Sequence, residues 1–164
     1  MKTVPLTQDK VALVDDEDFL RVSQYKWYAI KMSHLFYAHT NVRKADGKTT
    51  ILSMHVLLLP DAKRVDHQDG NGLNNQRHNL RSATHSQNMA NRRKHKNGTS
   101  SLFKGVHWHK AAKKFTAQIC VNHKRHHLGL FTSETDAAMA YDVAALHHFG
   151  AFARLNLPDL KAAA

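Results

Sequence analysis

The sequence predicts an α+β protein made of two parts that each contain small antiparallel sheets. Short apolar segments separated by turn residues fill the first sixty positions, which predicts a β-rich platform. A polar, turn-rich stretch over 65–88 precedes a helical pattern. Three short strands and one alanine-rich helix follow, which predicts a three-stranded antiparallel sheet packed on one helix. A chain of 164 residues is long enough for one ordinary domain or two small ones.

The N-terminal platform is expected to contain three apolar stretches after an acidic cluster, DDED, at 15–18. YKWYAI at 25–30 has the composition of a strand, and so does HLFYAHTNV at 34–42. After the turn ADG, TTILSMHVLLL at 49–59 predicts a strand that runs into a short helix. That helix should stop before Pro60, because the residue before a proline is disfavoured in helical backbone.

The middle segment begins with RVDH at 64–67, which should end a strand, and continues with the loop DGNGLNNQRHN at 69–79. A helix should begin near Thr84, because Thr84 and Gln87 have the spacing of a capping box. Asn97 and Gly98 are residue types that end helices, so the helix is expected to run to about Lys96.

The third segment follows NGTSS, a short linker, and begins with the strand FKGVHWHK. KFTAQICV at 114–121 alternates apolar and polar positions, and Asn122-His123 makes a turn into KRHHLGLF. Ser133 and Asp136 should cap a helix that Gly150 closes. The apolar face of the middle strand should pack on small and aromatic helix residues, and Trp108 should pack in the core or at the sheet edge.

Charge gives the strongest indication of a partner, because the net charge is +11 and the pI is about 10.0. No acidic residue occurs between Asp69 and Glu134, although that stretch contains twelve lysines and arginines. A surface that faces a polyanion needs this pattern, since a carboxylate there would repel phosphate. A solvated basic face that keeps the protein soluble is the alternative.

Other classes are disfavoured by what the sequence lacks. The longest apolar run is too short to span a membrane, and the N-terminus has no apolar signal segment. A single cysteine, Cys120, excludes an internal disulfide and fits a reducing compartment. We therefore expect a cytoplasmic protein.

The residue types around 66–88 suit the hydrolysis of a phosphodiester. His67 could take a proton from water at neutral pH, and Asp66 offers the hard oxygen that Mg²⁺ prefers. Asn88 could supply a further neutral oxygen ligand, and Asn79 could brace the loop. Asp66 and His67 alone would be an ordinary surface pair, so the hypothesis depends on the spacing of all four residues.

Residues 50–95 resemble a known family. The pattern VDH, GNGLNN, NLR and T-x-x-x-N resembles the HNH nucleases, in particular the homing endonucleases of phages and mobile introns. The resemblance implies a nuclease domain over 1–98 with a ββα-metal core at about 50–97. It also implies His67 as general base, Asp66 and Asn88 as metal ligands, and Asn79 as the central asparagine. One divalent metal ion is implied, Mg²⁺ or alternatively Mn²⁺, with activity in the cytoplasm or nucleoid of a host.

Residues 101–158 carry a second resemblance, to the Apetala-two/ERF DNA-binding domain. The matching elements are FKGV, a tryptophan, A-x-I, HLGLF, AAMAYDVAA and LNLP. The resemblance implies a domain at 99–160 that lays its sheet in the DNA major groove, with the helix behind. His107, His109, Cys120 and His127 depart from the plant members, so a plant-type target sequence does not transfer.

The expected partner is double-stranded DNA, bound by a monomer or a homodimer with no further protein partner evident. Groups expected to contact DNA in the first domain and the basic run after it are Arg81, Arg92, Arg93, Lys94 and Lys96. Those expected on the C-terminal sheet are Lys104, His107, His109, Lys114, Thr116, Gln118, Arg125 and His127. The basic run could instead be a solvated helix end. His55 fits a satisfied structural histidine, or part of a zinc site with His67.

The function expected from these features is a metal-dependent DNA endonuclease whose C-terminal module selects the site. Nicking and double-strand cleavage both remain open, and a homing role follows from the first resemblance. The alternative is a DNA-binding transcriptional regulator without catalysis. RNA recognition fits the charge but not a sheet that reads a major groove, because that groove is too narrow in A-form RNA.

Overall fold

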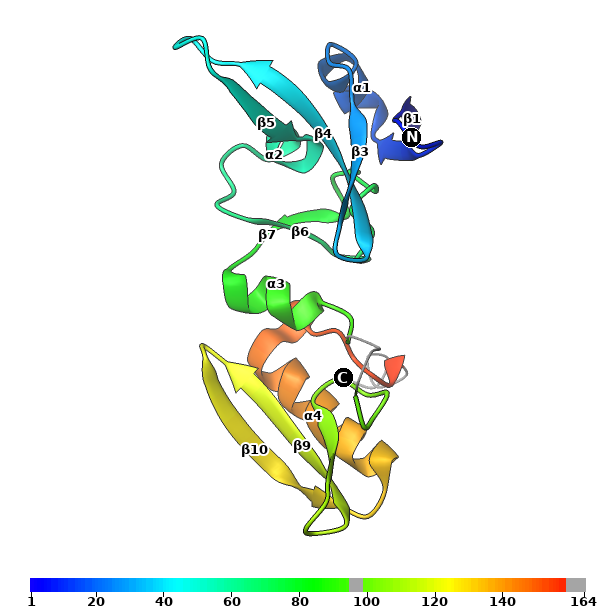
Figure 1. Ribbon diagram of the computed structural model, residues 1–164, viewed down its shortest axis with the longest axis vertical. Coiled ribbons are helices and arrows are strands. Elements are labelled where there is room, and N and C mark those ends of the chain that lie inside the picture. The colour runs from blue at the N-terminus through cyan, green and yellow to red at the C-terminus, as the bar shows by residue number, and fades with distance from the viewer. Residues whose placement is uncertain (95–98, 159–164) are drawn as a thin grey trace. The chain divides into compact units, whose positions relative to one another are not determined.

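A computed structural model describes residues 1–94 and 99–158, and it has the mixed α+β character that the sequence predicts (Figure 1). The chain divides into two compact units, Met1–Thr84 and His85–Ala164. This division falls earlier than the expected boundary between residues 98 and 99. Among the described residues, no helix combines the length and the apolar character needed to cross a membrane.

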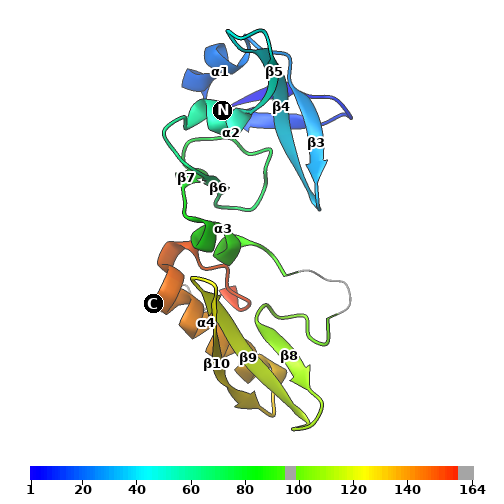
Figure 2. The same ribbon diagram turned by 60° about the vertical axis from the view of Figure 1, so that its left-hand side comes forward.

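The first unit contains three small antiparallel sheets and two short helices (Figures 1 and 2). Its strands are β1 (Lys2–Pro5), β2 (Val11–Val14), β3 (Tyr28–Met32), β4 (Leu35–Arg43), β5 (Thr49–Ser53), β6 (Val65–His67) and β7 (Leu80–Ser82). Its helices are α1 (Asp16–Val22) and α2 (Met54–Leu58). The sheets pair β1 with β2, β4 with both β3 and β5, and β6 with β7.

Two local features were not predicted from the sequence. The acidic cluster begins helix α1, where carboxylates in the first turn complement the partial positive charge of the helix N-terminus. The strand expected from Tyr25 starts instead at Tyr28. Trp27 is buried, and its indole N–H donates to the carbonyl of Val22 over 2.7 Å, which holds this part of the chain against the end of α1.

One apolar core joins all the sheets of the first unit. The buried residues of this core come from β1, β2, α1, the β3 entry, β4, α2 and β7, namely Val4, Ala12, Val14, Val22, Trp27, Ala38, Met54, Leu58 and Leu80. Leu80 lies directly opposite His67 in the β6–β7 pair. The strand that carries the Asp-His pair is therefore anchored to the core through its partner strand.

The second unit has three antiparallel strands in the order β10-β9-β8, at the positions that the alternation predicts. They are β8 (Val106–His109), β9 (Lys114–Val121) and β10 (Lys124–Phe131). Helix α4 (Glu134–Phe149) follows, and a short 3₁₀ turn, η1 (Gly150–Phe152), comes after it. The backbone N–H of Asp136 donates to the Ser133 hydroxyl over 3.3 Å, which is the expected helix cap.

Helix α4 packs closely on one face of this sheet. Ala117 and Ile119 of β9 are buried together with the helix residues Ala137, Ala138, Tyr141 and Ala145. Gly105 shows how tight the packing is, because an added Cβ would lie 2.0 Å from the Tyr141 ring. Its φ of +76° also favours glycine.

Helix α3 (His85–Asn91) belongs to the second unit. Ala90 is buried in the same cluster as Ile119 and Tyr141. The Lys104 ammonium donates to the carbonyls of Met89, Ala90 and Arg92, and the Arg154 N–H donates to Ala90 over 3.4 Å. These donors satisfy carbonyls at the end of the helix, so α3 ends at Asn91 instead of continuing to the expected Lys96. Asn97 and Gly98, the expected terminators, lie outside the described residues.

Candidate active site

Asp66 and His67 lie next to each other on β6, which pairs with β7. Their side chains are 4% and 7% exposed. This burial overturns the alternative of an ordinary surface pair. A charged carboxylate and an imidazole withdrawn from water both require compensating partners, and each has one nearby.

Asp66 forms an ion pair with Arg81, which lies directly opposite it on β7. The Arg81 Nε donates to Asp66 Oδ2 over 2.9 Å, and Nη2 lies 2.8 Å from the same oxygen. The Arg81 side chain is 16% exposed. The strand register thus directs Arg81, a residue expected to contact DNA, to the Asp66 carboxylate.

A zinc site that includes His55 and His67 was one alternative for this region. Among the residues that the structure describes, no group of three or more His, Cys, Asp or Glu side chains could hold a metal ion. A zinc site built on His55 and His67 therefore finds no third ligand of that kind there. The Asp66 carboxylate suits Mg²⁺ or Mn²⁺, which accept carboxylate, amide and water oxygens.

His67 contacts Asn75, a loop residue that the sequence analysis left without a role in the site. Its Nε2 lies 3.3 Å from the Asn75 Oδ1, and the Asn75 side chain is fully buried. Burial lowers the pKa of His67, while the Asn75 hydrogen bond and the charges of Asp69 and Asp66 oppose that shift. The imidazole is therefore neutral at pH 7, the state that can accept a proton.

Two further rings surround His67. The His55 and Tyr37 rings lie edge-on to it, with centroid distances of 5.2 and 5.8 Å. His55 was expected to be a satisfied structural histidine, but its buried Nδ1 has no hydrogen-bond partner among the described residues. Burial lowers the pKa of His55 to about 3. His55 precedes His67 by twelve positions, and no spacing in the sequence signals that the two rings meet.

Asp69 and Asn79 brace the loop between β6 and β7. The Asp69 carboxylate accepts from the backbone N–H of Asn71 and from the amides of Asn74 and Asn79, at 2.7, 2.9 and 3.0 Å. Burial raises the pKa of Asp69, but these hydrogen bonds outweigh it and lower the pKa overall. The Asn79 Oδ1 in turn accepts from the Asp69 N–H over 2.9 Å, so these two side chains tie the loop ends together.

The same loop is fixed against the rest of the first unit. At Gly72 an added Cβ would lie 2.5 Å from the Phe36 carbonyl oxygen and 2.5 Å from the Tyr37 ring, so the loop approaches β4 too closely for a side chain. On the other side, the Leu13 N–H donates to Leu73 and the Asn75 N–H donates to Leu13, both over 2.8 Å.

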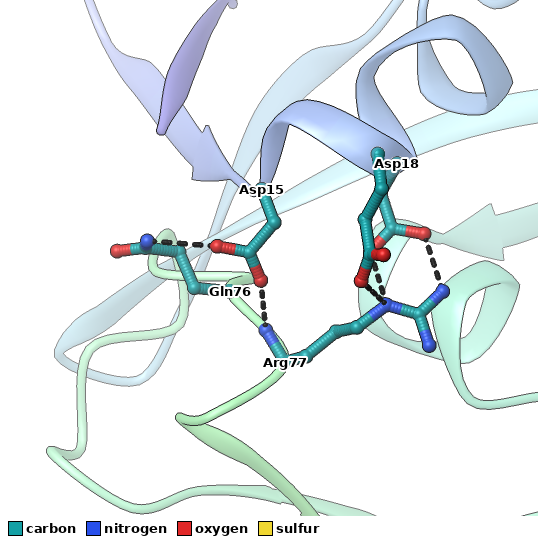
Figure 3. Close-up of polar contacts among 5 residues, drawn as sticks. Asp15, Asp18, Gln76 and Arg77 are labelled. Carbon is teal, nitrogen blue, oxygen red and sulfur yellow. Dashed lines mark hydrogen bonds and ion pairs between the residues drawn. The ribbon is translucent and has the colours of Figure 1, made fainter.

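The acidic start of α1 holds the second half of the loop (Figure 3). Asp15 accepts from the Arg77 backbone N–H over 2.7 Å and from the Gln76 amide over 3.0 Å. The Arg77 guanidinium makes two 2.7 Å bonds to Asp18, whose side chain is 3% exposed. Sequence reasoning identified DDED as acidic but gave it no role in the site, because its loop partners lie some sixty positions away.

The other residues expected to bind metal or DNA near the nuclease motif lie on or after α3. Asn88 is half-buried on that helix. Arg92 and Arg93, which were expected to contact phosphates, are exposed. Lys94 differs, because its ammonium donates to the carbonyls of Phe103 and Val106 and burial lowers its pKa. Lys96 lies outside the described residues.

One face of the C-terminal sheet carries a group that we call the basic sheet face. Cross-strand pairs place these residues on the side away from α4, namely His107, His109, Lys114, Gln118, Arg125 and His127. Trp108 is on the helix side, where its ring meets Phe115 at 4.9 Å, consistent with packing at the sheet edge.

Two residues expected to contact DNA from this sheet make contacts within the protein. Thr116 is 4% exposed, and its hydroxyl lies 3.2 Å from His127 Nδ1 and donates to the Gly129 carbonyl over 3.3 Å. Lys104 caps the end of α3, and burial, chiefly, lowers its pKa to about 8. Both side chains are committed to the fold, which argues against the DNA contacts expected of them.

The site therefore consists of a buried histidine beside a carboxylate on a two-stranded hairpin, followed by a loop that asparagine and aspartate side chains brace. Residues 54–90 match a family described as HNH endonuclease. The chain is also 34% identical over 143 residues to an uncharacterised HNH endonuclease of Acanthamoeba polyphaga mimivirus. The aligned region covers 84% of this chain and 70% of that protein. This chain belongs to the HNH endonuclease family and is a DNA endonuclease. Enzymes of this family generally use a divalent metal ion.

Proposed function

We propose that the protein is a metal-dependent endonuclease in which His67 is the general base and Asp66 is a metal ligand. The observation that carries this proposal is the buried Asp66-His67 pair on β6, with an imidazole that burial keeps neutral. Asn79 supports it by fixing the loop that follows the base. Asn88 keeps the predicted role of second metal ligand, and Mg²⁺ or Mn²⁺ is the ion that the oxygen ligands suit.

The proposed reaction is hydrolysis of a DNA phosphodiester bond. His67 takes a proton from a water molecule, and the water oxygen bonds to phosphorus. The bond to the 3′ oxygen breaks, and that oxygen takes a proton from solvent and leaves as a hydroxyl. A divalent cation, when bound, would stabilise the negative charge that develops on the phosphoryl and leaving oxygens. The ion pair with Arg81 orients the Asp66 carboxylate beside the base.

We propose that the second unit selects the cleavage site as an Apetala-two/ERF-type DNA-binding module. The basic sheet face supports this, because it carries lysine, arginine and histidine side chains, and strands β8–β10 contain no acidic residue. Arg125 and Gln118 have the side chains that hydrogen-bond base edges in a major groove. A homing role rests on the resemblance of the nuclease motif to phage and intron enzymes.

The number of cuts follows from the number of active sites. One site per chain hydrolyses one strand in each event, so a monomer would nick DNA. A double-strand break would require two chains or two successive events.

The test is cleavage of supercoiled plasmid and of a randomised DNA library with Mg²⁺, with and without EDTA. We expect metal-dependent products, whose sequenced ends give the target and the nicking pattern. His67→Ala should reduce cleavage to a slow residual rate and leave DNA affinity, measured in EDTA, unchanged. The matched control is His78→Ala, an exposed histidine in the following loop, which should cut like the parent.

A DNA-binding regulator without catalysis is the second candidate. The intact charge pattern of the basic sheet face favours DNA binding under either function. Tight, sequence-selective binding by the parent protein, with no metal-dependent product at any site, would support the regulator and overturn the catalytic proposal.

A further inference from the structure

We infer that Asn75 is a positioning residue that sets the tautomer and the ring orientation of His67. This inference rests on the proposed role of His67 as general base. It concerns a side chain that lies eight positions beyond the base, in a loop whose other asparagines form local turns.

The orientation of the Asn75 amide follows from its two hydrogen bonds. Its Nδ2 donates to the Leu73 carbonyl over 3.3 Å, and a carbonyl can only accept. The Oδ1 must therefore be the atom that faces His67 Nε2, 3.3 Å away. Since an amide oxygen is only an acceptor, Nε2 must carry the hydrogen. In the neutral imidazole, Nδ1 then has the lone pair that accepts the proton from water.

Asn75 is itself rigidly held. Its side chain is fully buried, and its backbone N–H donates to Leu13 over 2.8 Å. Leu13 and Asn74 form a parallel bridge between β2 and the loop. Two positions further on, Arg77 is fixed by Asp15 and Asp18 (Figure 3). The orientation of the base thus depends on β2 and α1, which lie far from it in the sequence.

The other loop asparagines show that this arrangement is specific to position 75. The side-chain oxygens of Asn71 and Asn74 accept from the backbone N–H two residues further on, at 3.1 and 3.4 Å. Those contacts shape the loop and do not involve His67. Asn75 instead directs its oxygen to the imidazole, as expected for a residue that orients a base.

The test compares two substitutions of similar shape, Asn75→Asp and Asn75→Leu. Aspartate keeps an acceptor for the His67 Nε2–H, and leucine does not. We expect Asn75→Leu to lower kcat about 100-fold while KM and DNA affinity stay within about twofold, a loss typical of removing a group that orients a catalytic histidine. Asn75→Asp should retain kcat within about tenfold of the parent at pH 8. The matched control is Asn71→Ala, which should leave kcat unchanged.

A double-mutant cycle separates positioning from a structural role. In the His67→Ala background, Asn75→Leu should cause no further loss of the residual cleavage, because the group that it orients is gone. Thermal unfolding midpoints of all variants check that the fold persists.

The outcomes distinguish failure of the proposed function from failure of the role assigned to Asn75. A parent protein that does not cut with Mg²⁺ contradicts the proposed function. The role of Asn75 alone would be overturned if the parent cuts, the His67→Ala variant cuts only at a residual rate, and the Asn75→Leu variant cuts at the parent rate. Equal losses from Asn75→Leu with and without His67, or equal losses from the Asp and Leu variants, would also overturn it.

Discussion

Protonation of His55 is costly to the fold. Burial lowers its pKa to about 3, with the charges of His67 and His39 as smaller causes, against an ordinary value of 6.5 in the unfolded chain. Between these values the unfolded chain binds the proton and the folded chain does not. The stabilisation is therefore present above pH 6.5 and is lost as the pH falls toward 3. We expect the free energy of unfolding to fall by about 3–5 kcal/mol over this range, at about 1.4 kcal/mol per pKa unit.

Denaturant unfolding between pH 7 and pH 4 measures this loss through the fluorescence of Trp27 in a Trp108→Phe background. Trp27 is buried in the same core as Met54, the neighbour of His55. His55→Leu should flatten the pH dependence, and His34→Leu, at an exposed position, should leave it intact. An equally steep loss of stability in the His55→Leu variant would contradict the assignment.

At the residue scale, the sequence indicated which side chains could act in hydrolysis better than it indicated which side chains touch one another. Asp66 and His67 are adjacent on one strand, and that adjacency is visible in the sequence. The contact between His67 and Asn75 is not visible, because Asn75 has the same local sequence character as Asn71 and Asn74. Its distinct role comes from the Leu13 hydrogen bond, which depends on the tertiary packing of β2.

Lys104 stabilises helix α3 as an element, and its removal should loosen that helix. Its ammonium donates to three carbonyls at the helix end, and with a pKa of about 8 it is largely protonated at pH 7. Hydrogen bonds from a charged group contribute about 1.5–3 kcal/mol, and Lys104→Met leaves the carbonyls without that donor. We expect amide hydrogen exchange in α3 to accelerate about 10- to 100-fold, which corresponds to about 2 kcal/mol.

The control for this prediction is Lys110→Met, in the exposed turn after β8. Both substitutions remove one positive charge, so a general electrostatic effect would appear in both. Unchanged exchange in α3 of the Lys104→Met variant would show that the cap is dispensable.

The elements themselves were largely predictable, and their ends were not. Alternation identified β9, and the cap residue Ser133 identified the start of α4. The end of α3 was misplaced by about five residues, because the carbonyls of Met89, Ala90 and Arg92 accept from Lys104, which belongs to a distant segment. Propensity within a helix carries no information about such a donor.

At the scale of the whole molecule, motif boundaries and packing boundaries do not coincide. The HNH family match covers residues 54–90, and the boundary between compact units falls inside it, after Thr84. The similarity to the mimivirus protein extends far beyond that match, over 84% of the chain. A nuclease fragment that ends at residue 84 would therefore lack Asn88, and one that ends at 98 would carry α3 without the strands and helix on which Ala90 packs.

The net charge of the molecule is useful for DNA binding only where it faces the DNA, and β10 offers a direct comparison. Arg125 pairs with Cys120 on the basic sheet face, and its neighbour Lys124 pairs with Val121 on the helix side. Both residues are exposed, and each substitution to alanine removes one positive charge.

If the basic sheet face contacts DNA phosphates, Arg125→Ala should weaken DNA binding at every salt concentration. It should also lower the slope of log K against log salt by about 0.9, the value for one lost phosphate contact. Lys124→Ala should leave the slope unchanged. Fluorescence anisotropy with a labelled duplex in EDTA, from 50 to 300 mM salt, measures both, and equal slopes for the two variants would mean that the opposite face, or neither face, meets the DNA.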